Sequence, residues 1–247
     1  MATLLLKKSY QLNNLKEVPF KDLWGSKGVF TTMRMVGKPP RLLLYKSHLD
    51  NLFTSIKKYG IKKKNLKNII KQLIKKNSIF KGPDNLFRIA LNKKLISISI
   101  RKRPKSKNNF NLLLFKYKRI DPKYKNLYYK KILSKLVKLD PTKFDIALVF
   151  KKKIIETGTS NLIFIKEGKI FSPKKYCYFG NTIKFINKKI KINYKDILIH
   201  KIHSFEEILL IGSGKGVTSV YKIDELNWKR KKKVCYKKIN KIYNSLA

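Results

Sequence analysis

One acidic residue between two apolar runs constrains this chain more than any other feature. Glu156 follows an apolar run from Ile146 to Ile155 that is broken by three lysines at 151–153. Small turn-forming residues occupy positions 157–160, and a second apolar run starts at Leu162. Only 14 of the 247 residues are Asp or Glu, against 60 that are Lys or Arg. A carboxylate at the edge of a core is costly unless it has a cationic partner or a chemical task. The pattern therefore predicts either a buried salt bridge or a functional acid.

The overall composition is that of a folded chain with a substantial core. Hydrophobic residues make up 43% and aromatic residues 12%, which excludes a disordered polycation. Charged residues interrupt every apolar stretch before it reaches about 18 residues, so we expect no membrane span. The apolar stretch at residues 2–6 is too short for a secretory signal. Two cysteines, Cys177 and Cys235, form no disulfide framework, and we expect a cytoplasmic protein.

The formal net charge of +46 comes almost entirely from lysines spread along the whole chain. A nucleic-acid-binding protein usually gathers its basic residues on one face. Lysine with abundant Ile and Asn is typical of an AT-rich coding sequence, and we favour this explanation. The alternative is weak, non-specific attraction to polyanions, which a charge of this size produces at low salt.

A polar segment at residues 104–110 separates two apolar strands and predicts a linker. We expect an N-terminal domain at residues 1–103 and a C-terminal domain at 111–247. Hydrophobic periodicity predicts helices at 48–56, 66–74, 126–139 and 229–246. Alternating or continuous apolar runs predict strands at 3–6, 29–35, 86–91, 95–101, 111–115, 144–150 and 161–165. Mixed helices and strands in two domains indicate an α+β fold.

The segment from Glu156 to Phe164 resembles the E-x-x-x-S-N-hydrophobic-F signature of the class IV aminotransferases. These fold-type IV enzymes use pyridoxal 5′-phosphate, in a small α/β domain and a larger β-rich domain with flanking helices. The resemblance implies that Glu156 pairs with the ring nitrogen of the cofactor and that Asn161 belongs to the cofactor site. A negative charge there keeps the ring cationic, so that it can withdraw electrons. It also implies a small-molecule amino substrate and a homodimer.

The family carries its cofactor on a lysine ahead of the glutamate. Lyase-like members place this lysine 33 residues before the glutamate and follow it with x-x-Asn. Lys123 and Asn126 occur at these positions, so the resemblance implies that Lys123 is the catalytic, cofactor-binding lysine. Lys118 and Lys125 stay open as alternatives, because lysines are frequent in this chain.

Phosphate-binding positions of the family match this chain in part. Phe179-Gly180-Asn181-Thr182 corresponds to a family turn whose amides and Thr hydroxyl bind phosphate, which implies a role for Thr182. Ser213, in a glycine-rich turn, occupies the position of a phosphate-binding Thr of the aminotransferases. The family's H-x-x-R-L element is His48-Leu-Asp-Asn51-Leu here. Asn51 replaces an arginine that would grip the phosphate with two hydrogen bonds.

The segment from Gly28 to Arg34 resembles the family element that begins the small domain. Its Phe-Thr-Thr core, which contains Thr31, is closer to the lyase version than to the Phe-Glu-Gly of branched-chain aminotransferases. Thr31 and Arg88 are candidate substrate-binding residues, with Arg88 suited to a carboxylate. His48 is expected to be structural. The three histidines lack zinc-ligand spacing, so we expect no metal site.

Three functions remain open from the sequence. The Thr31-Thr32 pair, the 33-residue spacing and Asn126 favour 4-amino-4-deoxychorismate lyase, which releases pyruvate and 4-aminobenzoate in folate synthesis. Ser213 favours an aminotransferase acting on branched-chain or D-amino acids. Asn51 and the net charge leave a third possibility, a non-catalytic polyanion-binding protein on a degenerate enzyme scaffold.

Overall fold

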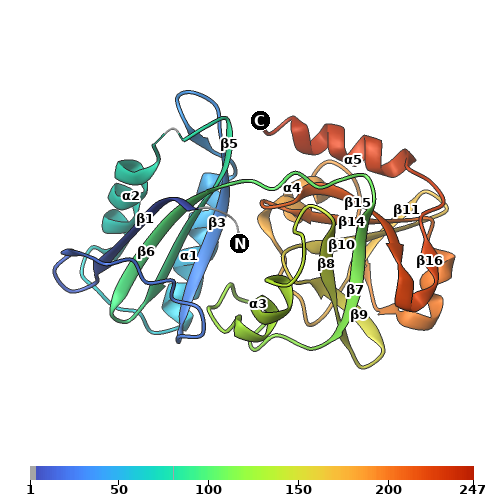
Figure 1. The fold of residues 1–247 in the computed structure, drawn as a ribbon, viewed down its shortest axis with the longest axis horizontal. Coiled ribbons are helices and arrows are strands. Elements are labelled where there is room, and N and C mark those ends of the chain that lie inside the picture. Colours follow the sequence, from blue (N-terminus) through green and yellow to red (C-terminus); the bar gives the residue numbers. More distant parts are fainter. Residues whose placement is uncertain (1–3, 80) are drawn as a thin grey trace. The chain divides into compact units, whose positions relative to one another are not determined.

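The computed structural model describes residues 4–79 and 81–247, so Thr3 of the first predicted strand lies outside the described residues (Figure 1). The chain divides into two compact units. The first unit runs to Arg103 and also includes residues 124–130, and the second contains residues 104–123 and 131–247. Among the described residues, no helix combines the length and apolarity needed to cross a membrane.

The first unit is an antiparallel six-stranded sheet packed against two helices. The strand order is β2-β1-β6-β5-β3-β4. The strands are β1 (Leu4–Gln11), β2 (Glu17–Val18), β3 (Gly28–Val36), β4 (Arg41–Leu42), β5 (Asp84–Asn92) and β6 (Leu95–Lys102), and the helices are α1 (Tyr45–Lys58) and α2 (Leu66–Asn77). The predicted hairpin at 86–101 and both predicted helices are confirmed.

Side-chain alternation along β3 and β5 creates two different faces. Val29, Met33 and Ile89 are fully buried in one core with residues of α1 and α2. Phe30 and Ala90 point to the opposite face and pack in a separate cluster with Leu23 and Leu127. Directly paired residues share a face, and Thr31 pairs with Ile89 whereas Thr32 pairs with Arg88. Thr31 and Arg88 therefore point to opposite faces of the sheet.

His48 is buried on the helix-covered face, where its Nδ1 lies 2.7 Å from the Thr31 hydroxyl. Burial lowers the pKa of His48 to about 3, and the positive charge of Lys125 acts in the same direction. In the unfolded chain the pKa returns to about 6.5. Below that pH the unfolded state binds the extra proton, so acid favours unfolding.

We therefore expect the free energy of unfolding to fall by about 1.4 kcal/mol per pH unit between about pH 6 and pH 4 through His48 alone. A His48→Gln variant should lose this contribution. Urea unfolding of both proteins across this pH range measures the difference between their slopes. Parallel slopes in the two proteins would show that His48 is protonated without penalty in the folded state.

The second unit is built on a ten-stranded sheet with the order β12-β11-β10-β14-β15-β7-β8-β9-β13, and β16 pairs with β15. Its strands are β7 (Phe110–Lys116), β8 (Phe144–Phe150), β9 (Lys153–Thr157), β10 (Asn161–Lys166), β11 (Lys169–Pro173), β12 (Asn193–Lys195), β13 (Ile197–Leu198), β14 (Glu207–Gly212), β15 (Gly216–Ile223) and β16 (Trp228–Lys229). Its α-helices are α3 (Lys130–Leu136), whose first residue clusters with the first unit, α4 (Asn181–Asn187) and α5 (Val234–Asn244). Short 3-10 helices cover Ile199–Ser204 and Asp224–Leu226.

Two cores stabilise the second unit. Helices α4 and α5 pack Ile183 and Ile239 against Ile163 of the sheet. A separate core contains Phe110, Phe164 and Trp228, and the Trp228 indole donates to the Phe205 carbonyl at 2.9 Å.

The predicted helix at 126–139 is wrong over its first turn. Residues 125–127 instead pair with β3: the Leu127 amide donates to the Gly28 carbonyl and the Phe30 amide to the Lys125 carbonyl, both at 2.9 Å. A Cβ at Gly28 would collide with Leu91 and Leu127, so this close pairing requires glycine. Only Lys130–Leu136 is helical, and Val137, directly after it, is 54% exposed.

The predicted C-terminal helix also begins later than expected. Trp228 and Lys229 belong to β16, where they pair with β15, and α5 starts at Val234. Val234, the first residue of α5, is 71% exposed. Ile239 and Tyr243, further along the helix, are buried.

Candidate active site

Glu156 forms a buried ion pair with Arg119. The Arg119 Nε donates to Glu156 Oε1 at 2.6 Å and its Nη2 donates to Oε2 at 3.2 Å. The two side chains are only 3% and 6% exposed. The Tyr178 amide adds a third hydrogen bond, to Oε2 at 3.2 Å. The structure thus confirms the buried salt bridge that the sequence left open, and it fixes the orientation of the carboxylate.

A second buried acid, Asp145, shapes the turn that follows Glu156. Its carboxylate accepts hydrogen bonds from the Thr157 and Thr159 hydroxyls at 3.1 and 2.5 Å. The Ser160 amide in turn donates to the Thr157 hydroxyl at 2.8 Å. Burial raises the pKa of Asp145, against the opposing effect of the Lys215 charge. Asp145 therefore holds the turn between β9 and β10 in place.

Asn161 connects this turn to helix α4. Its side-chain oxygen accepts a hydrogen bond from the Gly180 amide at 3.0 Å, and its side-chain nitrogen donates to the Tyr178 carbonyl. Gly180 is the residue preceding α4, and Thr182 is the second residue of that helix, with 3% of its surface exposed. Glu156 and Asn161 both bind the 178–180 segment, so the structure brings Glu156, Asn161 and the start of α4 together.

The turn that contains Ser213 lies against the same end of the sheet. Asn161 of β10 pairs with Ile211 of β14, and a Cβ added at Gly212 would lie 2.9 Å from the Ser160 hydroxyl. Gly212 therefore permits the close approach of these two turns. Ser213 follows directly and is half-buried. Glu156, Asn161, Thr182 and Ser213 thus come from segments that meet within the second unit.

Lys123 is exposed, and its backbone lies beside the ion pair. The Nη2 atom of Arg119 donates to the carbonyl of Pro122 at 3.0 Å, which fixes the residue just before Lys123. Lys125 belongs to the first unit, where it is half-buried with its Nζ 5.2 Å from the Phe30 ring centroid. Lys118 is exposed, with its Nζ 4.9 Å from the Phe150 ring.

Cys177 lies near Glu156, and its thiol is poorly suited to act as a nucleophile. Burial, followed by the negative charge of Glu156, raises the pKa of the Cys177 thiol to about 12. A thiol with such a pKa is almost entirely protonated at neutral pH. Among the described residues, no group of three or more His, Cys, Asp or Glu side chains is arranged to hold a metal ion.

Arg88 lies in an aromatic setting in the first unit. Its guanidinium lies over the Trp24 ring, 3.8 Å from the centroid, and 5.7 Å from that of Phe30. One nitrogen donates to Asp22, whereas Nε and Nη2 are buried without a hydrogen-bond partner among the described residues. Burial lowers the pKa of Arg88, partly offset by the Asp22 charge. Two buried donors without acceptors suit a ligand with a carboxylate group.

Thr31 and Asn51 occupy different settings in the same unit. Thr31 is 4% exposed and bonded to His48, on the face opposite Arg88, so it cannot contact a ligand there directly. Thr32, which sequence reasoning did not select, shares the face of Arg88 and is half-buried. Asn51 is half-buried on α1, and its carbonyl accepts from the Ser55 hydroxyl at 2.8 Å.

Comparisons with known proteins by sequence and by structure point to the same family. The sequence model of the family "Amino-transferase class IV" matches residues 28–223. No curated protein is significantly similar in sequence to this chain.

Solved structures resemble the chain over almost its full length. A branched-chain aminotransferase from Thermoproteus uzoniensis with norvaline has 16% identity and a TM-score of 0.76, covering 96% of this chain and 93% of that one. Escherichia coli branched-chain aminotransferase has 16% identity and a TM-score of 0.74, covering 97% and 94%. A hypothetical aminotransferase from Mycobacterium tuberculosis, in its PLP-bound form, has 12% identity and a TM-score of 0.73, covering 98% of both chains. At these identities the likeness establishes the fold, and the predicted fold-type IV architecture is confirmed.

Proposed function

This chain belongs to the class IV aminotransferase family, whose members use pyridoxal 5′-phosphate, and from that premise we propose that Lys123, Glu156, Asn161, Thr182 and Ser213 form its cofactor site. The observation that carries the proposal is the buried, oriented carboxylate of Glu156. When bound, the cofactor supplies an electron-withdrawing ring that stabilises negative charge on the substrate carbon. The proposed substrate is a small molecule with an amino group.

The residues present fit the cofactor. A carboxylate has about four acceptor positions, and Arg119 and Tyr178 use three of those of Glu156, which leaves one on Oε1 for a ring N–H. The hydroxyls of Thr182 and Ser213 supply donors for a phosphate. Asn51 stands at the position where the family has an arginine, so the phosphate depends more heavily on Thr182 and Ser213.

Each residue has a distinct proposed role. Glu156, paired with Arg119, provides the negative charge that favours a protonated ring nitrogen. Lys123 holds the cofactor covalently and moves a proton to and from the substrate carbon. Arg88 binds a substrate carboxylate with the two donors that have no partner within residues 4–79 and 81–247. Thr31, fixed by His48, positions β3. Lys125 is a second candidate for the covalent lysine, because it is half-buried whereas Lys123 is exposed.

For the reaction we propose 4-amino-4-deoxychorismate lyase, which forms pyruvate and 4-aminobenzoate. The Phe30-Thr31-Thr32 core of β3 and the spacing from Lys123 to Asn126 and Glu156 support this choice. The second candidate is a branched-chain or D-amino-acid aminotransferase, which Ser213 in its Gly-Ser-Gly turn supports. We further propose a cytoplasmic homodimer, by likeness to the family.

Product analysis separates the two reactions. Purified protein with the cofactor should form pyruvate from 4-amino-4-deoxychorismate when no keto acid is added. Strict dependence on 2-oxoglutarate, with formation of glutamate, would assign the protein to the transaminases instead. Absence of both products, in a protein that still binds the cofactor, would support a degenerate scaffold.

Arg88 should affect substrate binding more than turnover. We expect Arg88→Gln to raise KM by about 10–100-fold, because a charged hydrogen-bond pair is lost, with little change in kcat. Arg103→Gln is the matched control, since Arg103 directly follows β6 of the same unit but its guanidinium pairs with Asp84 at 2.9 Å. Steady-state kinetics measure both constants. An unchanged KM in Arg88→Gln would remove Arg88 from the substrate site.

A further inference from the structure

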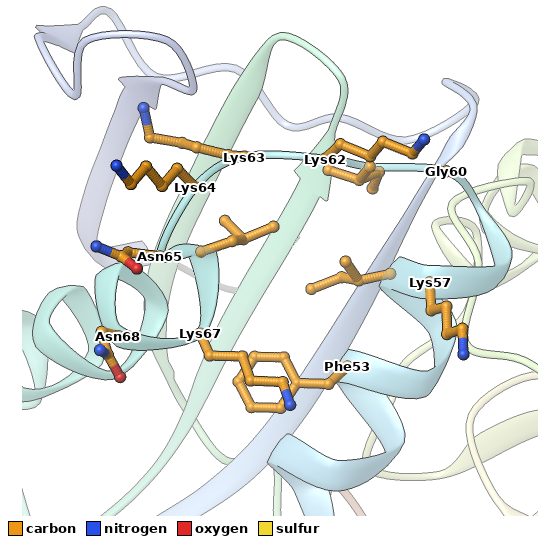
Figure 2. A pocket seen from close by; sticks show the side chains of 12 residues that line it. Phe53, Lys57, Gly60, Lys62, Lys63, Lys64, Asn65, Lys67 and Asn68 are labelled. Carbon is orange, nitrogen blue, oxygen red and sulfur yellow. The ribbon is translucent and has the colours of Figure 1, made fainter.

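Two neighbouring depressions lie on the first unit around the connection between α1 and α2. Their volumes are about 810 and 440 Å³, and both are lined by residues of the segment from Lys63 to Asn68. Figure 2 shows the larger one, with labelled side chains from α1, from the connection and from the start of α2 around it. None of the proposed cofactor or substrate residues lines either depression. The two depressions therefore need an explanation separate from the enzyme site.

Cationic side chains dominate the polar lining of these depressions. Five lysines line the larger one, two of which also line the smaller one, and neither lining includes an acidic residue: Lys57, Lys62, Lys63, Lys64 and Lys67. Within the described part of the chain, none of the five forms an ion pair. Lys63 donates to the Asn13 carbonyl at 2.6 Å, and the other four are exposed. Their mutual repulsion is relieved when a polyanion binds.

The remaining lining residues add aromatic and amide groups. The Phe53 ring is half-buried in the larger depression, with the Lys67 Nζ 5.7 Å from its centroid. Five amide side chains line the two depressions: Asn13, Asn14, Asn65, Asn68 and Gln72. Cations for phosphates, an aromatic face for stacking and amides for base edges are the groups that single-stranded nucleic acids require.

We propose that these two depressions form a binding site for single-stranded nucleic acid. The phosphates contact the lysines, and an unstacked base lies against Phe53 between the lysines of the connection and the first turn of α2. A membrane surface with anionic lipids is a poorer match, because its headgroups form a broad layer and these lysines surround a hollow. None of the proposed enzyme residues lines these depressions, so this is a second function rather than part of the first.

The main competing explanation is the net charge of the whole chain, and a matched pair of variants separates the two. The site variant carries Lys57→Gln, Lys62→Gln and Lys64→Gln, all exposed positions. The control variant carries Lys188→Gln, Lys189→Gln and Lys191→Gln, also exposed, in the second unit. Both variants lose three charges, so a difference between them reports on the site alone.

Fluorescence anisotropy with a labelled single-stranded RNA of about a dozen nucleotides measures binding as a function of salt. At about 0.15 M salt we expect the site variant to bind RNA at least about tenfold more weakly than the wild type. The slope of log K against log salt should become less steep by about 2–3, because three phosphate contacts are lost. The control variant should stay within about twofold of the wild type and keep the slope. Phe53→Leu should weaken binding without changing the slope, since it removes stacking and no charge.

Three results would overturn the proposal. Equal weakening by both triple variants would assign RNA binding to net charge, and absence of RNA binding at about 0.15 M salt would remove the site. Co-sedimentation with phosphatidylserine vesicles that the site variant abolishes, with RNA binding unchanged, would assign the depression to membranes. Urea unfolding and enzyme assays of both triple variants should match the wild type, which excludes misfolding as the cause.

Discussion

Replacing Arg119 with Met is expected to lower the free energy of unfolding by about 3–5 kcal/mol, measured by urea denaturation without cofactor. In the wild type, Arg119 binds both oxygens of the Glu156 carboxylate, whose side chain is only 6% exposed. The variant leaves this buried carboxylate without its cation. Removing one partner of a buried pair costs far more than the pair contributes, because the remaining charge stays desolvated. The double variant Arg119→Met/Glu156→Gln should regain part of the loss.

A surface pair in the same unit provides the control. Lys153 and Asp196 are 2.6 Å apart, but each side chain is 30% exposed. Lys153→Met should therefore cost no more than about 1 kcal/mol. A loss in Arg119→Met as small as in Lys153→Met would show that water reaches Glu156, and its proposed role at the ring nitrogen would then lose its physical basis.

Replacing Lys123 with Ala is expected to lower kcat by about 10²–10⁴-fold or more, because the covalent amine and the proton carrier are lost together. Stability should hardly change, since Lys123 is exposed. Lys118→Ala and Lys125→Ala are the matched controls and should keep most of the activity. Initial rates for all three variants, with added cofactor, measure the effect. A loss confined to Lys125→Ala would transfer the catalytic role to Lys125.

Physical reasoning from the sequence recovered the elements whose patterns are local. The alternation of β3, the hairpin of β5 and β6, and helices α1 and α2 follow from periodicity and turn residues. The burial of Glu156 was also predictable from the sequence, because acidic residues are scarce in this chain and this one borders apolar runs. The prediction of a helix at 126–139 failed because residues 125–127 pair with β3. Hydrophobic periodicity carries no information about such a contact between distant segments.

The candidate site was predictable only in part, for the same reason. Arg119, 37 residues from Glu156, could not be selected, since basic residues occur throughout the chain. Asp145 does carry a sequence signal, because it is an acid inside the apolar strand 144–150. That Thr31 and Arg88 lie on different faces of the sheet follows only from the strand register, which pairs Arg88 with Thr32 rather than with Thr31.

The most direct test of the central claim is to identify the lysine that binds the cofactor. The protein is mixed with less than one equivalent of pyridoxal 5′-phosphate, reduced with borohydride, digested and mapped by mass spectrometry. Limiting cofactor suppresses labelling of the many surface lysines. We expect one dominant modified peptide that contains Lys123, and loss of that label in Lys123→Arg. Label scattered over surface lysines, or unchanged in Lys123→Arg, would contradict the proposed cofactor site.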